Sequence, residues 1–320
     1  MRLPFVIASI VCSLLFSQSA SAEPARKAGK INSKKMGLSI RVEGGGWGSA
    51  CKEDIESVLY SVADELLTRI PAKLAAPIVV THTHGNPIAL YDKGVNGEYQ
   101  VQLHARDQRW SQLAYEFAHE LCHIMSNYEE NVGADTVKYN QWFEETLCEA
   151  ASLYTLRSLA ATWESSAGDP RWARLAPALR KFADQLVAEG HRQLPADAPL
   201  AKWLSDNEDR LRNDPYLREK NEVVANLLLP LFEQSPENWD ALHYLNLDPN
   251  DARNNLEQYL RNWYDKAPAA HKSFIAEVLA MLGITDVGPA HAIYAEAPAV
   301  TPSALPPAGP PSGQAGRVQK

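Results

Sequence analysis

The sequence predicts an α+β protein: a small mixed sheet near the N-terminus packs on one motif-bearing helix, and a mostly helical C-terminal half follows. Short apolar alternations, typical of strands, are confined to residues 37–104. Apolar residues at spacings of three and four dominate from residue 107 onward, as expected for helices. The motif His119-Glu120-Leu121-Cys122-His123 lies where the first pattern gives way to the second.

The N-terminus has the features of a secretory signal peptide. Arg2 precedes an apolar run from Leu3 to Phe16, and Ala20-Ser21-Ala22 is a small-residue cleavage site. This run is too short to anchor the chain in a bilayer, and no later stretch is long and apolar enough to do so. We therefore expect an exported protein, periplasmic or secreted, without a transmembrane segment in the mature chain.

Composition divides the rest of the chain. Residues 23–36 are polar and basic and are predicted to be a linker, while residues 286–320 are rich in Pro and Ala and are predicted to be a disordered tail. Between them lies one predicted domain, residues 37–285, with a sheet-containing part at 37–135 and a helical part at 136–285.

Charge argues against a nucleic-acid partner. The formal net charge is −8, and the only basic cluster, from Arg26 to Lys35, is short and falls in the predicted linker. A surface that follows phosphates needs a larger basic patch than this.

The expected elements begin with a strand at 37–42, where Leu38, Ile40 and Val42 alternate, and a helix at 52–70. Further strands are expected at 77–82, 86–91 and 98–104, the last from alternation of Tyr99, Val101 and Leu103 with polar residues. We expect 98–104 to be an edge strand, along which an extended substrate can pair.

The motif helix is expected to start after Asp107, a candidate N-cap, and to end in the polar stretch from Asn127 to Gly133. A second helix is expected from about Tyr139 to Ala160. The remaining helices are expected at 170–189, 199–211, 220–232, 236–244, 251–264 and 271–282.

The chemistry of the motif follows from its spacing. His119 and His123 are four positions apart, so both imidazoles lie on one face of a helix and can bind one zinc ion. Glu120 lies beside the coordination position that remains open. Zinc lowers the pKa of a bound water to about 7, and a nearby carboxylate can then act as general base. We expect Glu120 to be that base.

A catalytic zinc needs a third protein ligand. A metzincin would have Gly and His where this chain has Ser126 and Glu129, so that class is excluded. The second expected helix carries Glu145, with enough chain after His123 to turn and return alongside the first helix. Glu144, rotated by about 100° from Glu145, is the fallback ligand.

The segment Trp142-Phe143-Glu144-Glu145 resembles the glutamate-bearing helix of the gluzincins, zinc metallopeptidases in which a downstream Glu completes the zinc ligands. The resemblance covers residues 98–160 and implies a zincin-like fold with His119, His123 and Glu145 as ligands. It also implies that a carboxylate one turn after the ligand, here Glu149, orients a ligand histidine. Glu149 is longer than the Asp usual at that position.

An oxyanion donor is also required for peptide hydrolysis. Tyr216 is the first candidate, because aminopeptidase-type gluzincins carry a tyrosine ahead of a comparable helix, although their glycine-containing signature is absent here. His243 is the second candidate, with Tyr244 and Arg218 as alternatives.

The cysteines leave two outcomes open. Removal of the signal peptide leaves Cys51, Cys122 and Cys148. The last two follow His119 and Glu145 by three residues each, so the pair forms either a disulfide beside the metal or two buried thiols.

The sequence as a whole predicts an exported zinc hydrolase that acts on a peptide or protein. One alternative is a zinc-binding protein of the same fold that has lost turnover and serves as a binding module. A second is a helical interaction domain in which His119 and His123 are core histidines.

Overall fold

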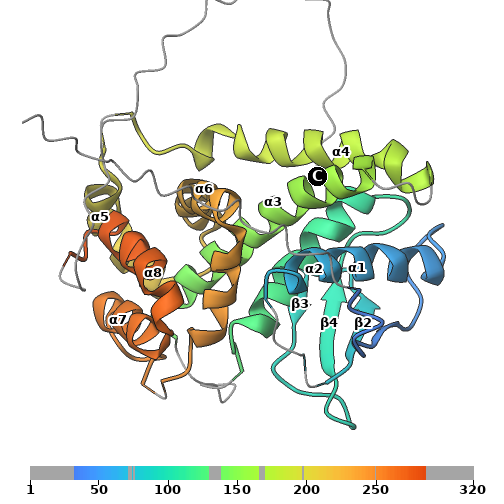
Figure 1. The fold of residues 1–320 in the computed structure, drawn as a ribbon, viewed down its shortest axis with the longest axis horizontal. Helices are drawn as coiled ribbons and strands as arrows, with labels where there is room; N and C mark the ends of the chain where they lie inside the picture. Colours follow the sequence, from blue (N-terminus) through green and yellow to red (C-terminus); the bar gives the residue numbers. More distant parts are fainter. Residues whose placement is uncertain are drawn as a thin grey trace, which may run out of the picture.

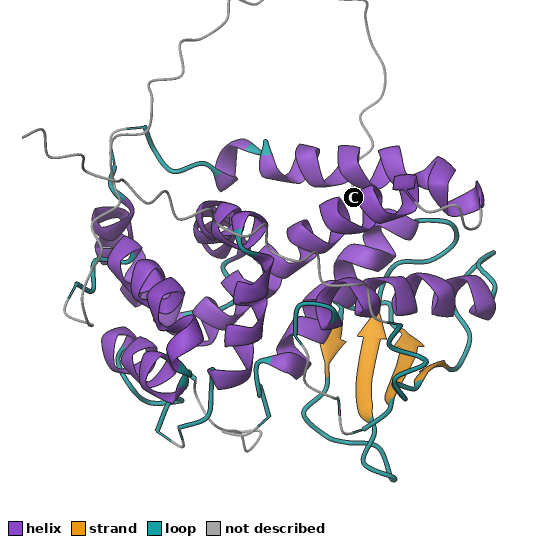
Figure 2. Cartoon of the chain, in the orientation of Figure 1, coloured by secondary structure: helices purple, strands orange, loops and turns teal. Residues whose placement is uncertain are grey.

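A computed structural model of the protein describes residues 32–70, 74, 76–129, 138–165, 170–196, 198–248 and 250–285. The fold is α+β, with one small mixed sheet and mostly helical content (Figures 1 and 2). The predicted signal peptide at 1–22, residues 23–31 of the predicted linker and the predicted tail at 286–320 lie outside the described residues.

The elements follow the expected order. The strands are β1 (Ile40–Val42), β2 (Ile78–His82), β3 (Ile88–Ala89) and β4 (Tyr99–Leu103). The helices are α1 (Lys52–Leu67), α2 (Trp110–Met125), α3 (Gln141–Ser165), α4 (Pro170–Val187), η1 (Gly190–Arg192), α5 (Leu200–Asn213), α6 (Arg218–Gln234), η2 (Pro236–Tyr244), α7 (Leu256–Lys266) and α8 (Ala269–Met281). Across these described ranges, no helix combines the length and apolar character needed to cross a membrane.

The sheet has the strand order β1-β2-β4-β3, in which β1, β2 and β4 are parallel and β3 is antiparallel to β4. Helix α1 makes the crossover that parallel pairing of β1 and β2 requires. Ile78 and Val80 of β2 and Val101 of β4 are fully buried, because α1 and α2 cover that face (Figure 1).

The expectation that residues 98–104 form an edge strand is wrong. Val101 of β4 pairs with Val80 of β2 on one side and with Ala89 of β3 on the other. The edge strands are instead β1 and the two-residue strand β3, whose Ile88 side chain is exposed.

The ends of α2 are set by two residues with positive φ. Asp107 has φ 59° and does not cap the helix, contrary to expectation: the N-cap position is Arg109, and the Asp107 carboxylate accepts a hydrogen bond from the backbone N–H of Ser49 at 2.9 Å. Asn127 has φ 57° directly after the last turn, which is a common way for a helix to stop. Its side-chain amide donates to the carbonyls of His243 and Leu245, so the end of α2 is tied to η2 and the residue after it.

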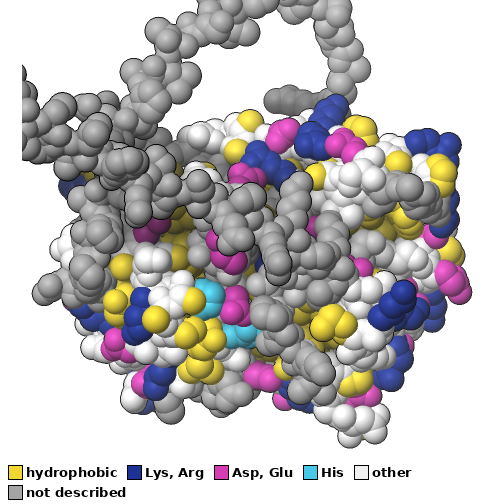
Figure 3. Space-filling view, in the orientation of Figure 1, with side chains coloured by type: hydrophobic (Ala, Val, Ile, Leu, Met, Phe, Trp, Pro, Cys, Tyr) yellow, Lys and Arg dark blue, Asp and Glu magenta, His cyan; other side chains and the backbone are white. Residues whose placement is uncertain are grey.

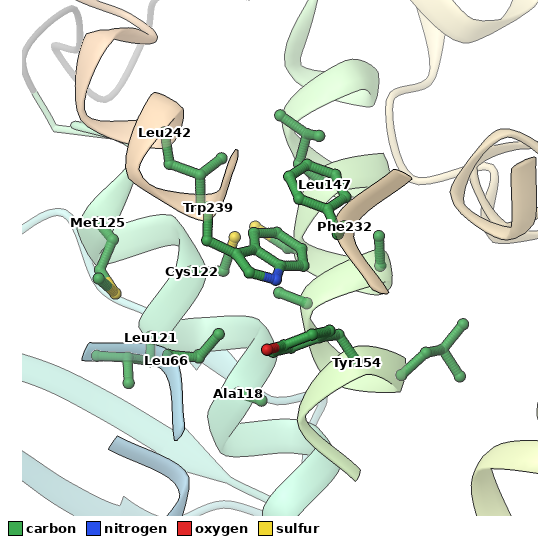
Figure 4. Packing of buried hydrophobic residues seen from close by; sticks show 14 of the residues in the cluster. Leu66, Ala118, Leu121, Cys122, Met125, Leu147, Tyr154, Phe232, Trp239 and Leu242 are labelled. Carbon is green, nitrogen blue, oxygen red and sulfur yellow. The ribbon is translucent and has the colours of Figure 1, made fainter. Parts of the chain in front are cut away.

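Helix α3, with 25 residues, runs through the middle of the molecule between the sheet-containing part and the helices α5, α7 and α8 (Figure 1). It packs against α2, α4 and α6 and is buried on most of its circumference. Near its centre, Tyr154 lies against Trp239, which stacks on Phe232 with ring centroids 3.7 Å apart (Figure 4). The two helices that carry the motif residues are thus held together by a continuous apolar core.

Candidate metal centre

Helices α2 and α3 run antiparallel, and their side chains meet in two successive layers. In the first layer, which we name the metal rung, His119 and His123 of α2 meet Glu144 and Glu145 of α3. In the second layer, one turn further along, Tyr115 meets Glu149. Spacings of four residues on each helix place these groups on facing surfaces.

Three side chains converge in the metal rung. His119 Nε2 lies 3.1 Å from Glu145 Oε2, and His123 Nε2 lies 3.6 Å from Glu145 Oε1. Zinc bonds of 2.0–2.1 Å with tetrahedral angles separate neighbouring donor atoms by about 3.3 Å. The three predicted ligands His119, His123 and Glu145 therefore lie side by side, with one nitrogen of each imidazole close to the Glu145 carboxylate.

Electrostatic interactions shift the pKa values of Glu145 and His123 in this layer. Burial alone would raise the pKa of Glu145, but the two neighbouring imidazoles lower it below its usual range. Burial alone would lower the pKa of His123, but Glu145 and Glu144 raise it well above its usual range. A raised pKa of His123 and a lowered pKa of Glu145 both favour an ion pair between the two side chains.

Glu144 is not directed at the metal position but supports His123. Its Oε1 lies 2.7 Å from His123 Nδ1, and its Oε2 accepts a hydrogen bond from Asn246 Nδ2 at 3.0 Å. Asn246 is held in turn by the Tyr259 hydroxyl, which donates to its Oδ1 at 2.9 Å. A proton on Nδ1 leaves the lone pair on Nε2, which points toward Glu145. Glu144 thus provides the orienting carboxylate that the sequence analysis assigned to Glu149.

Glu149 has other partners. Its carboxylate is buried, accepts a hydrogen bond from Arg192 Nη1 at 2.6 Å, and accepts another from the Tyr115 hydroxyl. Both of its oxygens are occupied in this way, and none of the hydrogen bonds described for it reaches His119 or His123.

Glu120 lies between the metal rung and the edge of the sheet. It is almost fully buried, and burial is the main reason that its pKa is raised above the usual range. The imidazoles of His119 and His123 act in the opposite direction, as does a hydrogen bond from the backbone of Ala89 in β3. A carboxylate with a raised pKa next to the metal ligands suits the role of a general base near neutral pH.

Tyr216, the first candidate for an oxyanion donor, lies over the metal rung. Burial and then the charge of Glu145 raise the pKa of its hydroxyl, so the hydroxyl stays protonated and can donate. Its oxygen accepts a hydrogen bond from Gln141 Nε2 at 3.0 Å. Gln141 also bonds the hydroxyl of Tyr91, the residue two positions after β3, which the sequence analysis did not single out.

His243, the second candidate, lies in η2 beside the C-terminal end of α2. Burial lowers the pKa of its imidazole, and a hydrogen bond with the backbone of Met125 raises it. Its Nε2 is buried without a partner among the described residues. These contacts do not connect its ring to the metal ligands, and they describe a packed residue.

Cys122 and Cys148 are buried free thiols, and Cys51 is an exposed one. Burial, followed by a hydrogen bond with Cys122, raises the pKa of Cys148 well above its usual range. One sulfur therefore faces the other across α2 and α3. The Cys148 sulfur also lies within 4.8 Å of nitrogen atoms of both His119 and His123.

The second layer is an ion-pair network, which we name the arginine rung: Tyr115, Glu149, Arg192, Arg218 and Glu222. Arg192 has a side-chain exposure of 2% and donates to Glu149 at 2.6 Å and to Glu222 at 2.9 Å. His191 and Glu189 lie beside it and, with Glu222, have ligand atoms within 4.8 Å of one another. Arg192 pairs with both of those carboxylates, so this group is an ion-pair cluster and not a second metal centre.

The metal rung is accessible from one face. Side-chain exposures are 16% for His119 and 13% for Glu145. On the face drawn in Figure 3, histidine side chains lie next to acidic and hydrophobic ones. No protein-family model matches the chain, and a comparison with curated proteins finds no match.

Proposed function

We propose that this protein is a zinc-dependent hydrolase with a zincin-like fold, a metallopeptidase of the gluzincin type. The observation that carries the proposal is the convergence of His119, His123 and Glu145, at the spacing of zinc ligands, beside the buried carboxylate of Glu120. The predicted signal peptide supports action outside the cytoplasm, in the periplasm or after secretion.

Zinc, when bound, supplies an electrophile that polarises the scissile carbonyl and acidifies the attacking water. Glu120 accepts the proton of that water as its oxygen bonds to the carbonyl carbon. Glu120 then gives the proton to the leaving nitrogen as the C–N bond breaks. Tyr216 donates a hydrogen bond to the carbonyl oxygen as negative charge develops there. Glu144 holds the His123 ring in the tautomer whose Nε2 is free to bind.

The substrate in this proposal is a peptide or protein segment in extended conformation. β3 is an edge strand of the sheet, and the backbone of Ala89 in that strand bonds Glu120. A chain paired with β3 therefore passes close to the general base.

The test is the Glu120→Gln variant of the mature protein. We expect it to bind one zinc ion with unchanged affinity and to lose peptide cleavage by a factor of about 10²–10⁴. Cleavage is measured on a peptide library, and metal content by elemental analysis. Glu219→Gln, which changes an exposed carboxylate in the first turn of α6, is the matched control. A wild-type protein that takes up no zinc after loading would falsify the proposal.

The alternative is a zinc-binding module without turnover, and Cys148 favours it. A thiolate at that position would occupy the fourth coordination site and close it to water. Cys148→Ser separates the two functions. A catalytic centre keeps its zinc affinity within a few-fold in this variant, whereas a closed site loses most of it.

A further inference from the structure

Tyr216 and Arg218 lie two residues apart at the entry to α6 and face successive layers of the α2 and α3 pair. Tyr216 is close to Glu145 in the metal rung. Arg218 donates from Nη2 to the Tyr115 hydroxyl at 3.0 Å in the arginine rung. Tyr115 precedes His119 by about one turn of α2, roughly 5.4 Å along its axis, so Arg218 bonds the layer next to the metal rung.

Every oxygen of the nearby carboxylates already has a donor other than Arg218. The two Glu149 oxygens accept from Arg192 and Tyr115. The two Glu222 oxygens are bonded by Arg192 and by the His191 ring. Arg218 stays 3.7 Å from Glu149 and 3.5 Å from Glu222, too far for a good hydrogen bond.

The Arg218 guanidinium is therefore held in place, and most of its N–H donors remain available for a further hydrogen bond. It has five N–H donors, and the hydrogen bond described for it uses one. Its side chain is 63% exposed, against 2% for Arg192 in the same network. A fixed guanidinium with free donors toward solvent is the arrangement that binds a carboxylate through two parallel hydrogen bonds.

We propose that Arg218 binds a carboxylate of the substrate, next to the bond that is cleaved. The inference rests on the proposed hydrolase and names the substrate class of the same site. An extended peptide rises about 3.3 Å per residue, so a carboxylate at Arg218 lies one or two residues from the scissile bond. The carboxylate comes either from the C-terminus of the peptide or from an Asp or Glu side chain.

The test measures binding without turnover. The full mature chain carrying Glu120→Gln is loaded with zinc, and its affinity for four pools of acetylated hexapeptides is measured by calorimetry. The pools combine Glu or Gln at a fixed position with a free or an amidated C-terminus. We expect at least one acidic pool to bind about tenfold more tightly than its neutral counterpart, the size of an effect of one charged hydrogen-bonded pair.

Adding Arg218→Gln should bring the acid-to-amide affinity ratio close to one, and Arg218→Lys should retain part of it, because Lys keeps the charge but not the planar fork. A preference that follows the free terminus identifies a C-terminal carboxylate, and one that follows Glu identifies a side chain. Two outcomes would overturn the inference: equal binding of acidic and neutral pools, or a preference that survives Arg218→Gln. The readout is independent of the hydrolase proposal, since zinc-loaded protein that binds acidic pools but never cleaves them contradicts only the latter.

Discussion

The metal rung lies entirely on α2 and α3, whereas the arginine rung, one turn further along, joins one residue of each of these helices to residues of η1 and α6. In the metal rung carboxylates face imidazoles, which have a lone pair to offer a metal when neutral. In the arginine rung carboxylates face guanidinium groups, which stay protonated and have no lone pair to give. The basic partner of the carboxylates therefore decides whether a layer has lone pairs to offer a metal or forms ion pairs alone.

The largest effect expected from this comparison is on zinc binding. Glu145→Ala removes a ligand and should weaken zinc binding by more than the 10–100-fold typical of losing an outer hydrogen-bond partner. Competition with a chelating dye measures the affinity. Unchanged zinc affinity in this variant would show that Glu145 is not the ligand and would favour Glu144 in its place.

The arginine rung is expected to respond in stability. Arg192→Met leaves Glu149 and Glu222 buried without their main cation and should lower the free energy of unfolding by about 3–5 kcal/mol. Arg218→Gln, at the exposed end of the same network, is the matched control and should cost about 1 kcal/mol or less. Denaturant unfolding measures both. Equal losses would show that Arg218 is a structural member of the network.

A smaller effect is expected for Glu144→Gln, which keeps the shape of the side chain but removes the charge that orients His123. Zinc affinity should fall by about 10–100-fold, with no loss of cleavage beyond what the lower occupancy explains. The same measurement on Asn246→Ala checks whether the hydrogen bond from Asn246 to Glu144 contributes.

The smallest expected effect is a shift in pH dependence. The pKa of His123 is raised in the metal-free protein, so protons compete with zinc at and below that pKa, and apparent zinc affinity should rise with pH until it is passed. Glu144→Gln removes one cause of the raised pKa, so the rise should occur at lower pH. Titrations of zinc binding between pH 5 and 9 compare the two proteins. An identical pH profile would separate Glu144 from the titration of His123.

Local patterns in the sequence predict most of the strands and helices. The strands and helices lie within a few residues of their expected positions because apolar periodicity is a local property of the chain. The strand order is not local, and for that reason the position of β4 between β2 and β3 was not foreseen. Asp107 failed as an N-cap because its carboxylate bonds the distant backbone of Ser49.

In the candidate site, too, local spacing predicted some contacts, and contacts between distant residues were not predicted. Spacing within α2 and α3 brings His119, His123 and Glu145 together, as the sequence analysis expected. Spacing could not tell which carboxylate of α3 orients a histidine. Glu149 instead accepts a hydrogen bond from Arg192, which lies in a short 3-10 turn far along the chain. No sequence motif marks Asn246 as the partner of Glu144.

The buried position of α3 limits which residues around the site can be substituted without disturbing the core. Glu144 and Glu145 stand on a helix enclosed by α2, α4 and α6, where almost any substitution disturbs packing. Tyr216 lies in the four-residue connector 214–217, and Arg218 is the first residue of α6. Both residues are exposed. Substitutions there leave the core intact. New substrate preferences can therefore arise at Arg218 while the proposed metal ligands remain unaltered.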